Sequence, residues 1–185
     1  MSIYRDVIHA VSNSYAAELK SNCKSSSAFS EAIKNAKDPS WLSPEELIAQ
    51  ASFTIQICKK NLNQQQIYYM DAVYTLPNIE REEGEFCGTA RTERKEKACL
   101  ALSYTLSEDL SLHPTACWFF IREYSGLPRV ISRKRAKEIV NKSEATLSRY
   151  KGKIFKELAA YHDQLLLHLH GPLQDADLIP KTANA

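Results

Sequence analysis

The chain has 185 residues and a mass of 21.0 kDa, and 44% of its residues are hydrophobic while 25% are charged. This length suits one domain of ordinary size or two small helical lobes, and it excludes a three-domain protein. With only 5 Gly and 7 Pro, the composition is typical of a folded helical protein and excludes a fibrous or largely disordered one.

Positive charge is concentrated in one segment, although the net charge of the chain is only +2. Residues 129–156 contain ten basic and two acidic residues, a net charge of +8, whereas the rest contains 14 basic and 20 acidic residues, a net charge of −6. A segment this basic is suited to binding a polyanion, whereas the acidic remainder is expected to face solvent or a protein partner. Charge density alone equally allows a solvated, lysine-rich helix surface.

Residues 1–77 are predicted to form an N-terminal helical region. Apolar residues at helical intervals indicate a helix over Ile3 to Leu19, and a shorter helical pattern spans residues 29–36. The third helix, over residues 43–60, opens with Ser-Pro-Glu-Glu, in which the serine caps the free N–H groups and the glutamates oppose the positive helix end. A fourth helical pattern over residues 67–74 ends before a proline.

Residues 78–91 are predicted to be a loop, because the structural signal is weakest there: an acidic stretch covers residues 80–85, and two glycines bracket Phe86 and Cys87. A helix is then expected over residues 92–106, with Thr92 as its cap. A His-Pro pair marks the start of the next helix, which reaches Tyr124. Its cluster of aromatic residues at 118–120 is too dense to stay on the surface of a soluble monomer, so we interpret it as core or interface.

Residues 92–173 are predicted to contain a helix-turn-helix that begins with a short basic helix, Arg133 to Val140. A turn at residues 141–143 follows, then a long helix from Glu144 to His170 that Gly-Pro is expected to stop, with a tail over residues 174–185. The fold class is therefore all-α, a helical bundle with a C-terminal helix-turn-helix and a long C-terminal helix. The inward positions are predicted to be Ala136, Ile139 and Val140 in the short helix, and Leu147, Tyr150, Ile154, Leu158, Tyr161 and Leu165 in the long one.

The opposite face of this motif is where the sequence predicts contacts with double-stranded DNA. A recognition helix presents its early residues to base edges in the major groove, and the planar fork of Arg149 can donate twice to guanine. The other cations are better suited to phosphates, and Ser143 is expected to cap the helix, whose positive end also favours a phosphate. The predicted DNA-binding residues are Arg133, Lys134, Lys137, Lys142, Ser143, Ala145, Thr146, Ser148, Arg149, Lys151 and Lys153.

The run from Arg135 to Leu147 is similar to the A-x-E-I-A-x-x-x-x-S-x-x-T-V pattern of the helix-turn-helix in sigma-factor region 4 and its relatives, with a turn shorter by about one residue. Within that group, the passage from Phe119 to Gly126 and on through Ser143 to Lys153 resembles the lambdoid-phage antitermination proteins of the Q type. The resemblance covers about a fifth of the chain. It implies binding to a promoter-proximal DNA element and to paused RNA polymerase, which becomes resistant to terminators.

Catalysis and metal binding have no positive signal in the sequence. The histidines at 162, 168 and 170, with Asp163, are not spaced to share a metal on one helix face, and no phosphate loop or catalytic motif occurs. We therefore expect no enzyme activity, cofactor or metal. No secretory signal or membrane-length apolar run is visible, so a cytoplasmic location is expected. Reduced thiols, several of them buried, are expected at Cys23, Cys58, Cys87, Cys99 and Cys117, an odd number without a C-x-x-C pair.

Other functions remain open at this point. The Tyr68-Tyr69 pair and the aromatic cluster at 118–120 could stack bases of a single strand, although their spacing favours core packing. The chain could also be a protein-interaction module with accessory DNA binding, or a plasmid or phage repressor. Self-association into a homo-oligomer is compatible with each of these functions.

Overall fold

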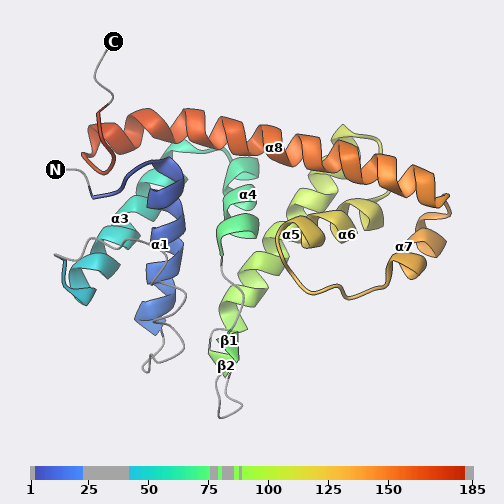
Figure 1. Ribbon diagram of the computed structural model, residues 1–185, viewed down its shortest axis with the longest axis horizontal. Helices are drawn as coiled ribbons and strands as arrows, with labels where there is room; N and C mark the ends of the chain where they lie inside the picture. The colour runs from blue at the N-terminus through green and yellow to red at the C-terminus, as the bar shows by residue number, and fades with distance from the viewer. Residues whose placement is uncertain (1–2, 23–41, 76–78, 81–85, 88, 182–185) are drawn as a thin grey trace. The chain divides into compact units, whose positions relative to one another are not determined.

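The computed structural model describes residues 3–22, 42–75, 79–80, 86–87 and 89–181 (Figure 1). Within these ranges the chain is built from helices, apart from one pair of two-residue strands. The predicted helix at residues 29–36 lies outside the described residues. The all-α fold class and the long C-terminal helix are confirmed, and that helix is drawn as one continuous ribbon from orange to red.

The chain packs into two compact units, and neither is continuous in sequence. Unit 1 comprises Met1–Asn63, Tyr74–Thr92 and Leu165–Ala185, and unit 2 comprises Gln64–Val73 and Glu93–Gln164. This division differs from the predicted boundaries, because the helix after Gln64 groups with the helix-turn-helix and the end of the long helix groups with the N-terminal helices.

In unit 1 two helices, α1 (Val7–Asn22) and α3 (Pro44–Asn61), pack against each other. The predicted cap of α3 is confirmed, since Ser43 and Glu46 form a reciprocal capping box. The predicted start of α1 at Ile3 is wrong. The helix begins after Asp6, whose carboxylate accepts a 2.8 Å hydrogen bond from the His9 N–H.

The end of the chain also belongs to the core of unit 1. Helix α8 (Glu144–Asp175) contains Pro172, so the predicted stop at Gly171 and Pro172 is wrong. A proline costs about 3 kcal/mol inside a helix, but Leu173 beyond it is fully buried and continues the apolar face. After the helix, Leu178 is buried and its carbonyl accepts a 2.8 Å hydrogen bond from the Tyr4 N–H, so residues up to 181 are not a loose tail.

The predicted loop at 78–91 contains two short strands, β1 (Ile79–Glu80) and β2 (Phe86–Cys87), which pair antiparallel with Ile79 opposite Cys87. Helix α5 (Thr89–Asp109) starts directly after them. Thr92 therefore lies inside the helix and is not its cap.

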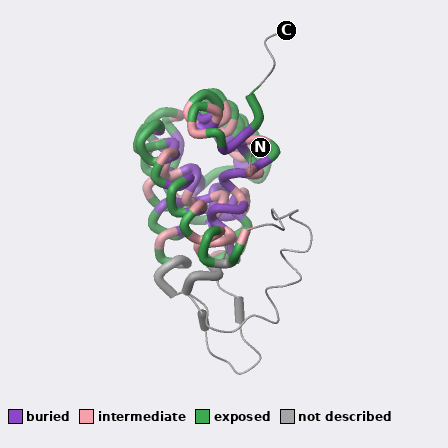
Figure 2. Tube along the Cα trace, turned by 90° about the vertical axis from the view of Figure 1, so that its left-hand side faces the viewer, coloured by how far each residue is buried: buried purple, intermediate pink, exposed green. Residues whose placement is uncertain are grey.

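Unit 2 consists of α4 (Gln64–Tyr74) except its last residue, most of α5, α6 (Pro114–Tyr124), α7 (Arg133–Val140) and the first part of α8. Buried residues recur along these helices at helical intervals. Figure 2 marks the buried residues of the chain in purple. In the aromatic cluster of α6, Phe119 and Phe120 are confirmed as core, whereas Trp118 is half-buried. The large side chains that are fully buried here are Tyr69, Met70, Leu102, Leu106, Phe120, Ile121, Leu147, Ile154 and Leu158.

Three of the five cysteines lie in the described residues whose burial is known, and all three are free and buried: Cys58, Cys99 and Cys117. Burial raises the pKa of Cys58 to about 12 and that of Cys117 to about 11, because the thiolate is poorly solvated there. At neutral pH burial therefore keeps Cys58 and Cys117 in the protonated form.

Candidate nucleic-acid interface

Helix α7 begins and ends where the sequence predicts. Ser132 caps it by accepting a 3.1 Å hydrogen bond from the Arg135 N–H, and Ala136 and Val140 face the core. The prediction that Ile139 also faces inward is wrong, because its side chain is 41% exposed. A two-turn helix buries a single i, i+4 row, and residue 139 lies beside that row.

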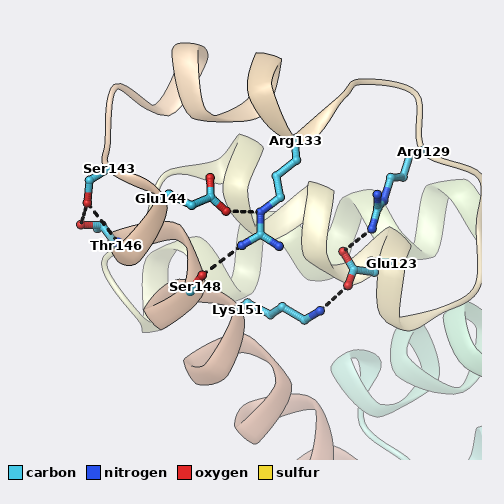
Figure 3. Close-up of polar contacts among 8 residues, drawn as sticks. All are labelled: Glu123, Arg129, Arg133, Ser143, Glu144, Thr146, Ser148 and Lys151. Carbon is cyan, nitrogen blue, oxygen red and sulfur yellow. Dashed lines mark hydrogen bonds and ion pairs between the residues drawn. The ribbon is translucent and has the colours of Figure 1, made fainter.

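The turn between α7 and α8 is built from local interactions. Asn141 adopts the left-handed conformation, with φ of 50°, which asparagine tolerates better than most residues. Ser143 then caps α8 by accepting a 3.2 Å hydrogen bond from the Thr146 N–H, and its hydroxyl also contacts the Thr146 hydroxyl (Figure 3). The predicted turn and cap are confirmed. Ala145 in the first turn of α8 is exposed.

Arg133 connects the two helices of the motif. Its guanidinium donates a 3.0 Å hydrogen bond to the Ser148 hydroxyl, and its Nε lies 2.5 Å from Glu144 Oε1 in an ion pair without hydrogen-bond alignment (Figure 3). Arg133 is half-buried between α7 and the first turns of α8. The structure therefore uses this predicted phosphate ligand to hold the two helices together.

Glu123 connects three elements of unit 2. From the last turn of α6 its carboxylate accepts hydrogen bonds from Lys151 on α8 and, at 3.3 Å, from Arg129 in the segment before α7 (Figure 3). The bond from Lys151 lowers the pKa of Glu123, with further lowering by both positive charges, and partial burial opposes the effect. Each cation also sits over an aromatic ring, Lys151 over Phe155 at 5.0 Å and Arg129 over Phe119 at 5.8 Å.

Arg122 is a positioning residue that the sequence reading missed. Its side chain is buried, and its Nε and Nη2 donate to the Pro128 carbonyl at 3.3 and 2.9 Å while Nη1 pairs with Glu96 at 3.1 Å. The guanidinium also lies 5.0 Å from the centre of the Trp118 ring. An arginine four residues after a tryptophan in a dense apolar run was the available signal. Arg122 fixes the segment that leads into α7.

The outward face of α8 is continuous over its first turns. Exposed residues recur every three or four positions, which is the spacing of one helix face. The buried row on the other side confirms most of the predicted apolar stripe, although Tyr150 is only half-buried. The exposed positions on this face are Glu144, Ala145, Ser148, Arg149, Gly152, Lys153 and Lys156.

Six cations of the motif are exposed, and none has an ion-pair partner within the part of the chain that the structure describes. We call them the outer cations: Lys134, Lys137, Lys142, Arg149, Lys153 and Lys156. Of the predicted DNA-binding set, the structure thus exposes Lys134, Lys137, Lys142, Ser143, Ala145, Ser148, Arg149 and Lys153, and it leaves Arg133, Thr146 and Lys151 half-buried in intramolecular contacts.

The described residues contain no group of three or more His, Cys, Asp or Glu side chains that could hold a metal ion. His162 instead packs edge-on against Tyr69 in unit 2, with ring centres 6.3 Å apart. Across the same residues, none of the helices combines the length and the apolar character that crossing a bilayer requires.

No protein-family model matches this chain, and no curated protein shows significant sequence similarity to it.

Proposed function

We propose that the chain is a transcription regulator that binds double-stranded DNA through α7 and α8, with α8 as the recognition helix. The observation that carries this proposal is the contrast in unit 2 between two sets of cations. The outer cations have no ion-pair partner among the described residues, whereas Arg129, Arg133 and Lys151 are paired with Glu123 or Glu144. Exposed cations without partners are what a phosphate backbone requires.

The first turns of α8 are suited to entering a groove of DNA as well as to contacting its phosphate backbone. Ala145 and Gly152 are small and exposed, so the helix surface lies close to whatever it meets. Arg149 stands between them with no partner among the described residues, and it is the residue we assign to base recognition. Lys134, Lys137, Lys142 and Lys153 are assigned to phosphates.

The test is a titration of the protein on a duplex selected from random sequences and on an unselected duplex, at two salt concentrations. Arg149→Ala is expected to lose about 1–3 kcal/mol on the selected duplex and little on the random one. Lys134→Ala is expected to weaken both similarly and to lower the log–log salt slope by about 0.9.

The matched control is Lys60→Ala, which removes an exposed lysine of α3 in unit 1 and is expected to change neither quantity. Equal losses by Arg149→Ala on both duplexes would overturn the assignment of α8 to base recognition. A salt slope near zero for the unaltered protein would overturn DNA binding itself and favour a protein-interaction module.

The resemblance to the Q-type proteins supports a finer proposal, that the regulator acts on RNA polymerase as an antitermination factor. A single-round transcription assay tests it on a template that carries the selected duplex near the promoter and a terminator downstream. Increased read-through that Arg149→Ala abolishes supports antitermination. Loss of initiation without any change in read-through would make the chain a repressor.

A further inference from the structure

Positive charge is divided within the helix-turn-helix region in a way that has consequences for specificity. Three of its cations, Arg129, Arg133 and Lys151, are in ion pairs with Glu123 or Glu144. Non-specific binding to DNA depends on the number of phosphates that cations neutralise. A cation that stays in an ion pair with a carboxylate is therefore not available to neutralise a phosphate of random DNA.

Glu123 is the carboxylate best placed to retain its cations. Its side chain is only 20% exposed, and its two oxygens are used separately, Oε1 by Lys151 and Oε2 by Arg129. Phe155 and Phe119 support the two cations from their ring faces. An exposed ion pair exchanges easily with solvent ions, whereas a partly buried carboxylate with two cations and aromatic support is harder to open.

Lys151 also lies beside the outward face of α8, three residues after Ser148 and two before Lys153. A lysine released there could reach phosphate next to the recognition helix. The same bond to Glu123 attaches α8 to α6, which Arg122 connects to the segment leading into α7. Loss of Glu123 would therefore release charge and loosen the recognition helix together.

We propose that Glu123 is a specificity-determining positioning residue: it withholds Lys151 and Arg129 from phosphates, which weakens binding to random DNA, and it holds α8 in the orientation that reads bases. The inference rests on the proposed function of α7 and α8, and it concerns how that interface discriminates between duplexes.

The experiment compares Glu123→Gln with Glu108→Gln, which removes the same charge from an exposed position of α5 in unit 2. We expect Glu123→Gln to raise the log–log salt slope for random duplex by about 0.9 for each released cation. For one released cation, the gain in affinity for random duplex is then roughly threefold larger at 50 mM than at 200 mM salt. Binding to the selected duplex is not expected to strengthen, so the ratio of affinities falls about threefold or more. Glu108→Gln should leave both duplexes unchanged.

A second pair of variants keeps Glu123 in place, and melting curves check the fold of each variant. Lys153→Met should lower the salt slope on random duplex by about 0.9, whereas Lys151→Met should leave it unchanged because Lys151 makes no phosphate contact. If Lys151→Met lowers the slope as much as Lys153→Met, or if Glu123→Gln behaves like Glu108→Gln, the inference is wrong and the DNA-binding proposal stands. If the unaltered protein binds neither duplex, both are wrong.

Discussion

The inner and outer sides of the helix-turn-helix in unit 2 carry the same residue types with different roles. On the outer side, Arg149 and its neighbouring lysines are exposed and have no ion-pair partner among the described residues. On the inner side, Arg122, Arg133 and Lys151 are at least half-buried and bind carbonyl, hydroxyl or carboxylate oxygens of other elements. The comparison teaches that the density of basic residues in a sequence overstates the charge available to a ligand.

The largest expected effect comes from placing a charge on the inner side of α8. Leu147→Asp or Ile154→Asp should destabilise unit 2 by more than about 3 kcal/mol, because the carboxylate would be buried without a partner. Lys153→Asp is the control on the outer side and should change the free energy of unfolding by less than about 0.5 kcal/mol. Urea denaturation followed by circular dichroism measures both. Equal stability of the two kinds of variant would show that the buried row is accessible to water.

A smaller loss is expected for an inner cation. Arg122→Met should cost about 1–3 kcal/mol, because it leaves the Pro128 carbonyl without its two donors. Lys134→Met, which removes an outer cation, should cost less than about 0.5 kcal/mol but should weaken DNA binding. The contrast between the two sides fails if Arg122→Met is as stable as the unaltered protein.

Acid should remove the stability that the ion pairs of Glu123 contribute. Because the pKa of Glu123 in the folded protein lies below its ordinary value of 4.5, its contribution to stability is fully present above pH 4.5 and is lost as the pH falls through the lowered pKa. The difference in free energy of unfolding between the unaltered protein and Glu123→Gln should therefore narrow below pH 4.5. Denaturation curves across this range measure it, and a difference that is constant with pH would show that the carboxylate is not ion-paired.

The smallest effect is expected at a residue between the two sides. Ile139→Gln should change stability by less than about 0.5 kcal/mol because the side chain is exposed, whereas Val140→Ala on the adjacent buried row should cost about 1–2 kcal/mol. The melting temperatures of the two variants measure these two losses of stability. A larger loss for Ile139→Gln would restore the broader inward face that periodicity alone predicts.

The structure agrees best with prediction where local chemistry decides. Caps at Ser43, Ser132 and Ser143 and the turn after Val140 follow from side chains that bond to backbone within three or four residues. The start of α1 belongs to this class as well, since Asp6 and the His9 N–H are three residues apart and could have been recognised as a cap.

What the sequence by itself determined is therefore the all-α fold, the bounds of α7, the turn and the start of α8 in the helix-turn-helix, and the excess of positive charge in that motif. Only the tertiary structure decided that α8 continues past Pro172, where Leu173 extends the buried face of the helix. It also decided which cations remain available. Glu123 and Lys151 are 28 residues apart, and no periodicity or propensity specifies an ion pair between side chains that only the packing of two helices brings together.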